Sequence, residues 1–386
     1  MIKSGQRRGR EGARVKPVMM LKRCVATLAA IAGCVLGVAA PAAAAVPSPG
    51  AGRAIPRGLL PVATSWPAPL RGIVLGYPSR TVGARPSLIV TGDGGRTWRP
   101  LPAPPVRYRA VGQPDAAWAG GIIAVTDGTH VFATRDNGRH WSAERLAGAP
   151  GGSWVGHLAI ATGRVFALVT TVGAATGSAA VYSGPAQAGV LRPVPGLSIT
   201  GSPAYGDITT AGALQVDLGA GFAAERYWYS RDGVHFTAAP LPCPATTMAF
   251  LGGVHAGRVS ALCTGSPSDV APGINDKQAW AAAQPGGTFR PSGPVFVAPN
   301  QEEFAAASAQ AMTVATIFTL AVTGNAGRTW TATLTQPNGA AWSDLSFSSA
   351  TTGVVVSATT TNANKQVATV YRTTDAGRTW HPLTLP

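Results

Sequence analysis

Acidic side chains, histidines and cysteines are all scarce in this chain. Its 386 residues include 16 Asp and Glu against 31 Lys and Arg, together with 6 His and 4 Cys. The histidines lie far apart and none forms a His-x-x-x-His pair, so the sequence predicts no metal site. It also contains no Gly-x-Ser-x-Gly nucleophile elbow and no phosphate-binding loop. We therefore expect neither a metal nor a cofactor.

The basic residues do not indicate a nucleic-acid-binding protein, because no run of Lys and Arg contains interleaved aromatic residues. Residues 1–45 hold eight basic residues and one acidic residue, so residues 46–386 keep 23 basic and 15 acidic side chains. The remaining net charge of +8 favours anionic surroundings. We predict an anionic ligand, a glycan or a protein as the partner, and no nucleic acid.

The start of the chain has the pattern of a secretory signal. Residues 1–23 are rich in Lys and Arg, residues 24–40 are almost wholly apolar, and residues 41–45 offer small side chains to a peptidase. The apolar run is shorter than the ~20 residues that span a membrane. We predict an exported protein, secreted or held at the cell surface, with residues 1–45 as its signal peptide.

Some alternatives stay open for this segment. A single membrane anchor could take the place of a cleaved signal. Ile31-Ala32-Gly33-Cys34 fits a lipobox, and a lipid on Cys34 would then be the only link to a membrane. The true start could be Met19 or Met20 instead of Met1.

An eight-residue pattern recurs along the rest of the chain. Residues 91–98 (TGDGGRTW) return almost unchanged at residues 373–380 (TTDAGRTW), with looser copies at 134–141 and 323–330 and a shortened copy at 230–236. The carboxylate or amide of each copy can accept hydrogen bonds from nearby backbone N–H groups and close a turn. The glycine suits a positive φ, and the aromatic residue begins the next strand. The positions concerned are Asp93, Gly95, Trp98, Asp136, Gly138, Trp141, Asp232, Asn325, Gly327, Trp330, Asp375, Gly377 and Trp380.

This octet resembles the Asp-box, or bacterial neuraminidase repeat, Ser/Thr-x-Asp-x-Gly-x-Thr-Trp. Asn325 and His140 depart from that pattern, and the copy at 230–236 is one residue short. The repeat occurs in sialidases, other glycosidases, sortilin-type receptors and photosystem II assembly factor propellers. The resemblance implies a structural role on the outer hairpin of a propeller blade, between its third and fourth strands and away from the active face.

The spacing of the repeat predicts the fold. With degenerate copies near residues 185 and 285, successive centres lie 40 to 53 residues apart, which fits four short strands per unit. β-branched runs bounded by Gly and Asn favour strands, and no helical periodicity follows the signal. We predict an all-β, seven-bladed β-propeller with four-stranded antiparallel blades at residues 61–386, after a Pro/Ala/Gly-rich linker at 46–60. A single closed ring favours a monomer.

Two cysteines remain beyond the signal region, Cys243 and Cys263. Gly252-Gly253 lies midway between them, between two strand-like runs. A hairpin folded at these glycines would place the two sulfur atoms opposite each other, and export would favour a disulfide. Two buried free thiols are the alternative.

The loops that join second to third strands, and one blade to the next, are expected to share the face opposite the octets. The former are residues 78–87, 170–179, 264–278 and 358–366. We predict a ligand-binding face there. Its residues would be Arg80, Arg85, Arg107, Asp276, Lys277, Glu302, Glu303 and Lys365.

A sialidase would need more than this sequence shows. The resemblance implies a Tyr nucleophile with a Glu partner, an acid/base Asp and three arginines, one of them in an Arg-Ile-Pro motif. Residues 53–56 (RAIP) are only a broken form of that motif. Tyr205 near Asp207, or Glu225 near Tyr227, would have to serve. The carboxylates outside the octets are few, among them Asp115, Asp207, Glu225, Glu302, Glu303 and Asp344.

We therefore favour a non-catalytic propeller that binds a ligand or a protein or glycan partner outside the cell or at its envelope. A sialidase-like or other glycoside hydrolase is the first alternative. An assembly or stability factor for an envelope complex is the second.

Overall fold

The computed structural model describes residues 58–386, except 110–112, 172–176, 202–203, 211–212, 222, 256, 268–273, 301–302, 337–339 and 361–365. These residues belong to one compact unit, Val46–Pro386. Their regular elements are all strands, and none of them forms a helix with the length and hydrophobicity to span a membrane. The predicted signal peptide, Cys34 and most of the predicted linker lie outside the described residues and stay predictions.

The strands form antiparallel sheets that follow one another along the chain. The first sheet contains β1 (Leu60–Ala68), β2 (Arg71–Tyr77), β3 (Ser87–Thr91) and β4 (Arg99–Leu101). The second group contains β5 (Asp115–Ala119), β6 (Ile122–Thr126), β7 (Val131–Thr134) and β8 (Ser142–Leu146). The third contains β9 (Trp154–Ala161), β10 (Arg164–Thr171), β11 (Gly177–Pro185) and β12 (Val190–Gly201). The fourth contains β13 (Ala204–Thr209), β14 (Leu214–Ala220), β15 (Ala223–Ser230) and β16 (Thr237–Ala239).

Three further sheets complete the described chain. The fifth contains β17 (Met248–His255), β18 (Arg258–Pro267), β19 (Ile274–Ala282), β20 (Arg290–Pro291) and β21 (Phe296–Pro299). The sixth contains β22 (Glu303–Ala306), β23 (Met312–Ala315), β24 (Thr319–Thr323) and β25 (Thr331–Thr335). The last contains β26 (Ala341–Phe347), β27 (Gly353–Thr360), β28 (Gln366–Thr373) and β29 (His381–Pro382).

Two of these groups share hydrogen bonds. β8 and β12 pair in parallel through Val190 and Leu191, which joins the second and third groups into one eight-stranded sheet. In the fifth sheet, β20 and β21 pair with successive parts of β19 and together take the place of a fourth strand. Counted by their antiparallel ladders, the described strands form seven units, called blades 1 to 7 in chain order below.

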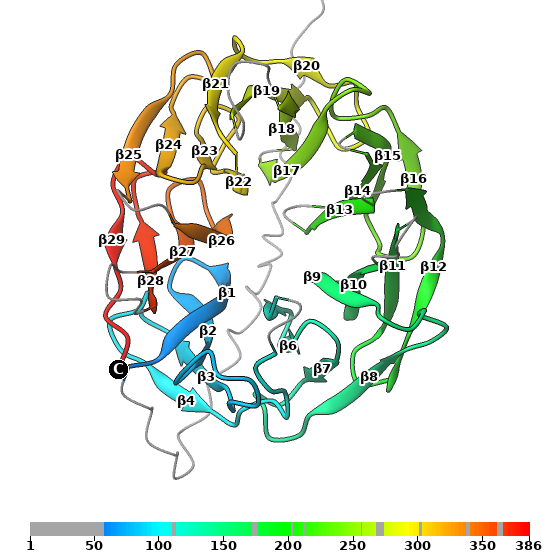
Figure 1. Ribbon diagram of the computed structural model, residues 1–386, viewed down its shortest axis with the longest axis vertical. Helices are drawn as coiled ribbons and strands as arrows, with labels where there is room; N and C mark the ends of the chain where they lie inside the picture. Colours follow the sequence, from blue (N-terminus) through cyan, green and yellow to red (C-terminus); the bar gives the residue numbers. More distant parts are fainter. Residues whose placement is uncertain are drawn as a thin grey trace, which may run out of the picture. The chain divides into compact units, whose positions relative to one another are not determined.

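The blades surround a central axis with their first strands innermost (Figure 1). Each first strand contacts the next one, in the order β1, β5, β9, β13, β17, β22 and β26, and β26 contacts β1 again. Radial antiparallel sheets around a closed ring of first strands make a β-propeller. The predicted all-β propeller class is confirmed.

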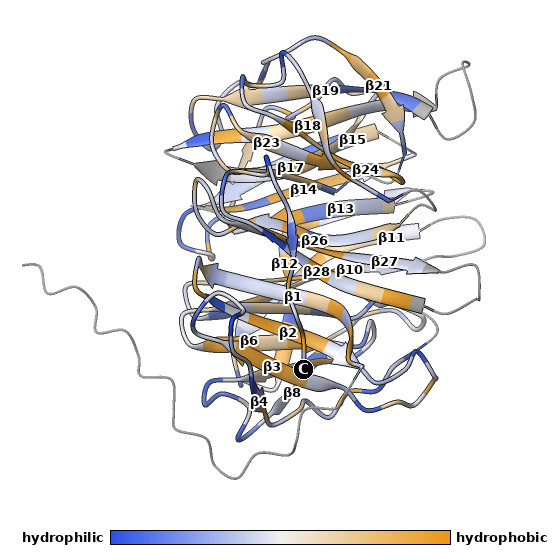
Figure 2. Cartoon of the chain, turned by 90° about the vertical axis from the view of Figure 1, so that its left-hand side faces the viewer, coloured by the Kyte–Doolittle hydropathy of each residue, from blue (hydrophilic) through white to orange (hydrophobic). Residues whose placement is uncertain are grey.

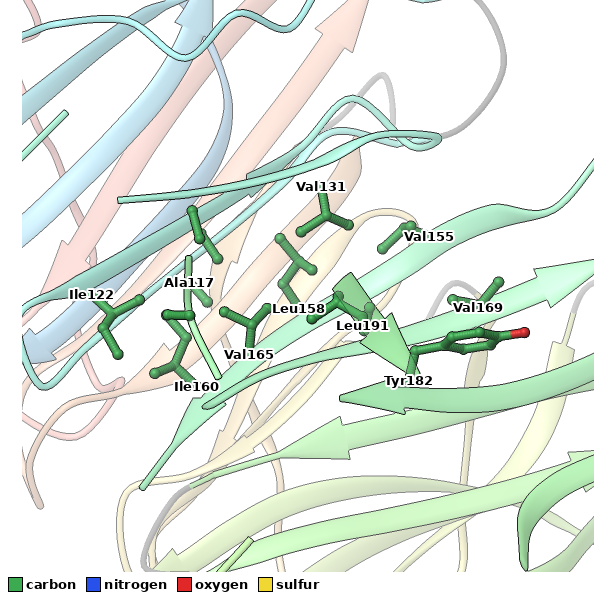
Figure 3. Packing of buried hydrophobic residues seen from close by; sticks show 14 residues of the cluster. Ala117, Ile122, Val131, Val155, Leu158, Ile160, Val165, Val169, Tyr182 and Leu191 are labelled. Atoms are coloured by element: carbon green, nitrogen blue, oxygen red, sulfur yellow. The ribbon is translucent and has the colours of Figure 1, made fainter. Parts of the chain in front are cut away.

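The hydrophobic core lies between neighbouring blades, because each sheet must bury its apolar face against the next sheet. Between blades 2 and 3, for example, Ile122 and Val131 pack against Leu158, Val165 and Leu191. Figure 3 shows these side chains gathered between the strands of the two blades. Figure 2 shows the matching pattern along the chain, with hydrophobic residues on the strands and many hydrophilic ones at the turns.

The ring closes without exchange of a strand, since blade 1 and blade 7 are each built from one continuous stretch. Three hydrogen bonds join the two ends instead. The Thr64 N–H donates to the Asp344 carboxylate (2.7 Å), Trp98 Nε1 donates to the Thr384 carbonyl (3.2 Å), and Arg372 donates to the Pro69 carbonyl (3.2 Å). Side chains therefore hold the first and last blades together.

Blade 5 confirms one prediction and corrects two others. Cys243 and Cys263 form the predicted disulfide, with both residues buried. The hairpin between them does not turn at Gly252-Gly253, because β17 and β18 extend past these glycines, which lie at a shift in register. The loop predicted at 264–278 is also too long, since β18 and β19 occupy most of it.

Candidate functional site

The octets form the predicted turns between third and fourth strands. In the first copy, the Asp93 carboxylate accepts a hydrogen bond from the Thr97 N–H (2.9 Å) and another from the Thr97 hydroxyl (2.6 Å). The Thr91 hydroxyl accepts from the Gly95 N–H (2.8 Å). Gly95 has a φ of 89°, in the left-handed region that favours glycine. Each octet therefore closes with side chains from its own eight residues.

The residues that depart from the pattern keep these contacts. His140 replaces Thr, and its Nδ1 lies 2.6 Å from the Asp136 carboxylate. Asn325 replaces Asp, and its Nδ2 donates to the Thr329 hydroxyl (2.9 Å). The hydrogen bond across the turn survives in both copies because either partner can supply the donor.

The octets also join neighbouring blades. Trp141 Nε1 donates to the Pro102 carbonyl of the preceding blade (3.2 Å), as Trp98 does to Thr384 across the ring closure. A Cβ atom at Gly138 would come within 2.6 Å of the Pro102 oxygen. Glycine is therefore required there both for its φ and for the close approach of the preceding blade.

A pocket of about 650 Å³ lies within the ring of first strands. All seven first strands contribute to its wall. Its polar and aromatic residues include Thr64, Ser65, Trp66, Asp115, His157, Tyr205, Asp207, Phe250, Glu303 and Asp344. Among the described residues that line it there is no arginine, lysine or cysteine.

The carboxylates in this wall link each blade to the next. Asp115 on β5 accepts from the Leu158 N–H on β9 (2.6 Å), and Asp207 on β13 accepts from the Leu251 N–H on β17 (2.7 Å). Asp344 on β26 accepts from Thr64 on β1, which closes the ring. Asp344 has a φ of 56° and lies at a register shift in its strand, a conformation that Asp tolerates better than most residues.

Two other first strands make the same kind of link. The backbone of Leu345 on β26 hydrogen-bonds Glu303 of β22. The Trp118 N–H on β5 donates to the Ser65 hydroxyl on β1 (2.9 Å). One polar side chain per junction therefore satisfies a backbone donor at these five boundaries, as buried polar groups require.

Burial and mutual repulsion shape the electrostatics of the pocket. Burial is the main cause that raises the pKa of Glu303 to about 7; His157 opposes it, and the carboxylates of Asp207 and Asp115 add to it. Burial also raises the pKa of Asp115 and that of Asp207, and raises that of Asp344 well above its ordinary value. Several carboxylates on one small ring favour protonated forms because like charges repel.

Two residues of this region were not singled out by sequence. His157 is exposed in the pocket wall, where it faces the carboxylates of Asp115, Asp207 and Glu303. Asp217 on β14 is fully buried opposite Asp207, and burial together with Asp207 raises its pKa well above normal. Neither residue lies in one of the repeated octets, so no local motif marks it in the sequence.

The predicted ligand-binding residues do not gather at one place. Arg80, Arg85 and Arg107 all belong to blade 1, where Arg107 donates to the Gly83 carbonyl (3.3 Å). Glu303 lines the central pocket. Asp276 is exposed on β19, and neither it nor the three arginines line the pocket.

Lys277 corrects one prediction. It lies on β19 and not in a loop, is fully buried, and donates to the Asn275 side chain and the Ala298 carbonyl. Its ammonium group cannot reach a ligand at the surface. Glu302 and Lys365 lie outside the described residues and stay predictions.

Comparison with known proteins shows a similarity of fold and nothing further. No family model matches the sequence, and no curated protein matches it. An ulvan lyase of polysaccharide lyase family PL25, solved with GlcA(1-4)Rha3S bound, is 10% identical with a TM-score of 0.52, covering 82% of this chain and 91% of the lyase. YCF48 from Cyanidioschyzon merolae is 12% identical with a TM-score of 0.49, covering 83% of this chain and 97% of YCF48. The WD40 β-propeller domain of Doa1 is 9% identical with a TM-score of 0.40, covering 84% and 92%.

Proposed function

We propose that this protein is an exported, non-catalytic β-propeller that binds a ligand or a protein or glycan partner outside the cell or at its envelope. We also take the octets to be Asp-box repeats with a structural role. The central pocket is the observation that carries the proposal. It is a concave site with aromatic surface and convergent polar groups, which is the usual form of a ligand site.

The wall of the pocket favours a ligand that donates hydrogen bonds. A carboxylate has about four acceptor positions, and backbone N–H groups of the same strand or the next blade take only one or two of them on Asp115, Asp207 and Asp344. The remaining lone pairs suit amine or hydroxyl donors, and Trp66 and Phe250 offer apolar surface beside them. A cationic ligand would stabilise the deprotonated carboxylates that burial and mutual repulsion disfavour, so amino sugars or basic peptide segments fit this pocket better than an anionic ligand.

Hydrolysis of sialosides has less support. The pocket wall holds no arginine in its described part to bind a substrate carboxylate. Burial, followed by the charges of Asp217 and Glu225, raises the pKa of Tyr205 far above normal, whereas an activated nucleophile needs the opposite shift or an adjacent base. No observation favours the assembly-factor alternative over a binding propeller.

Binding is tested by calorimetric titration of the full-length exported protein with chitosan oligosaccharides and with an extended lysine-rich peptide. At least one probe should bind, and His157→Ala combined with Phe250→Ala should weaken that binding by about tenfold or more. His381→Ala, on the outermost strand β29, is the matched control and should leave the affinity unchanged. If the pocket substitutions leave the affinity unchanged, the pocket is not the binding site of the probe.

Catalysis and export need separate measurements. Sialosides and aryl glycosides should not be hydrolysed above a heat-killed control. Turnover that disappears on Tyr205→Phe or Glu225→Gln in folded protein would instead establish a glycosidase.

N-terminal sequencing of the exported protein should find a start near Val46, and a lipid-modified Cys34 would support the lipoprotein alternative.

A further inference from the structure

Four octets carry an arginine at the same position, directly before their Thr or His. These residues are Arg96, Arg139, Arg328 and Arg378, and all four are exposed. The turn does not need their side chains, because its hydrogen bonds use the Asp or Asn, the Thr or His, and backbone groups. Within the described part of the chain, no hydrogen bond or ion pair engages these guanidinium groups. Their repetition therefore has no explanation in the stability of the turn.

The ring brings these arginines onto neighbouring blades. They belong to blades 6, 7, 1 and 2, which are consecutive because blade 7 contacts blade 1. Val234 takes the equivalent place in the shortened octet of blade 4, and Gly287 takes it in blade 5. The outer turns of blades 6, 7, 1 and 2, called the arginine arc here, thus present one free guanidinium per blade.

Cationic charge is concentrated where the arc crosses the ring closure. Arg372 of β28 lies close to the turn of blade 1, since a Cβ atom on Gly94 would meet its guanidinium at 3.2 Å. Burial, and then the charge of Arg96, lowers the pKa of Arg372. Asp93 does not pair with these cations, because its oxygens are occupied by Thr91 and Thr97. An external anion would relieve this repulsion.

A second pocket, of about 580 Å³, lies along the arc between blades 6 and 7. Half of its lining residues carry hydroxyl or amide side chains, and Asp375 and Arg378 of the last octet also belong to the lining. No aromatic residue is among its described lining. Hydroxyl groups suit the hydroxyls of a sugar chain, whereas single-stranded nucleic acid is usually held by aromatic stacking. The residues with hydroxyl or amide side chains are Ser308, Gln310, Thr323, Thr329, Thr331, Thr333 and Thr351.

We propose that the arginine arc binds an acidic polysaccharide, with carboxylate or sulfate groups on Arg96, Arg139, Arg328 and Arg378 and sugar hydroxyls in the pocket between blades 6 and 7. Guanidinium groups match carboxylate and sulfate oxygens in a bidentate geometry. A chain that follows the rim can meet one arginine per blade. This surface is separate from the central pocket, so the two sites can be tested independently.

The test measures binding of the full-length exported protein to polygalacturonate, dextran sulfate and neutral dextran at several salt concentrations. At least one acidic polymer should bind, with an affinity that falls as salt rises, and dextran should not bind. The two acidic polymers distinguish carboxylate from sulfate as the preferred group. Replacing the four arc arginines together by Gln should weaken binding about tenfold or more, because each lost cation removes a contact to the polyanion.

A control variant removes the same charge from other blades, with Gln in place of the exposed residues Arg192, Arg231, Arg258 and Arg290. It should bind within about twofold of the unmodified protein, since its changes lie on blades 3 to 5. Equal losses in the two variants would overturn the proposal, because net charge alone would then explain binding.

Two further results decide the class of ligand. Gln310→Ala with Thr331→Val should weaken polysaccharide binding severalfold while leaving the Tm within the range of the control variant. Binding of oligo-dT as tight as that of the preferred polysaccharide would also overturn the proposal, in favour of nucleic acid. The arc variant should still bind any amine probe of the central pocket, so failure of one site is distinguishable from failure of the other.

Discussion

At the scale of single residues, the octet shows how a short sequence specifies its own turn. The residue before the octet glycine is also left-handed, with φ values of 59°, 61° and 62° at Asn137, Ala326 and Ala376. A left-handed conformation costs a non-glycine residue roughly 1 kcal/mol. The hydrogen bonds of the turn therefore have to offset backbone strain in three of the copies, whereas the first copy has Gly94 at this position.

Removing the octet carboxylate should loosen one turn and little else. Asp375 accepts hydrogen bonds from the Thr379 N–H and hydroxyl and from Thr373. Asp375→Ala should lower the free energy of unfolding by about 1–2 kcal/mol because these donors lose their acceptor. Urea denaturation measures this change. Loss of binding to an amine probe of the central pocket at an unchanged Tm would contradict this structural role of Asp375.

At the scale of elements, the disulfide attaches the segment that connects blade 4 to blade 5 to a strand of blade 5. Cys243 lies in the segment between β16 and β17, and Cys263 lies on β18, beside Ala249 in the sheet register. The bond therefore ties the connection from blade 4 to the second strand of blade 5. Both cysteines belong to the hydrophobic cluster between these two blades.

Loss of this bond should be costly. Cys243→Ala with Cys263→Ala should lower the free energy of unfolding by about 2–4 kcal/mol, since the unfolded chain gains conformational freedom. Denaturant unfolding measures the loss, and non-reducing peptide mapping should recover the linked peptides from exported protein. Free thiols in that protein would refute the disulfide.

At the scale of the whole molecule, the pocket carboxylates make stability depend on pH. Burial raises the pKa of Glu303 from its ordinary 4.5 to about 7. Between these values the folded protein keeps a proton that the unfolded chain has released, so stability falls as pH rises through this window. The raised pKa values of Asp115, Asp207 and Asp344 change stability in the same direction.

Thermal unfolding between pH 4.5 and pH 8 tests this expectation. The Tm should decline across the window, and Glu303→Gln should reduce the decline because an amide has no proton to lose. Glu225→Gln, on the exposed side of β15, is the control and should not change the profile. A Tm that rises steadily with pH would contradict the assignment.

Ring closure also belongs to this scale, because it joins the two ends of the described chain. Leu383 and Leu385, like Trp98, pack against the hydrophobic cluster between blades 7 and 1. Deletion of residues 383–386 should cost about 2 kcal/mol, from lost apolar contact and the lost partner of Trp98. Hydrogen exchange should then quicken in β1 and β26. An unchanged exchange rate would mean that the Thr64–Asp344 and Arg372–Pro69 hydrogen bonds hold the ring without these residues.

Local sequence was enough to predict the strands, the octet turns and the pairing of Cys243 with Cys263. The octet is predictable because its hydrogen bonds join residues at most four positions apart. The alternation of strand-like runs and turns fixes four strands per repeat, and this periodicity implies a propeller. The predicted position of the hairpin turn was wrong because Gly253 serves a register shift within the strand.

Only the tertiary structure decided which side chains come together in a pocket or on a surface. Asp115 meets its partner 43 residues away and Asp344 meets its partner 280 residues away, so no local pattern marks them as a ring of pocket carboxylates. Lys277 looked like a loop cation, yet the extension of β19 buries it. The arginine arc likewise exists only because the ring sets blade 7 beside blade 1. Sequence determined the turns and strands through contacts within each repeat, whereas contacts between repeats determined which side chains share a surface.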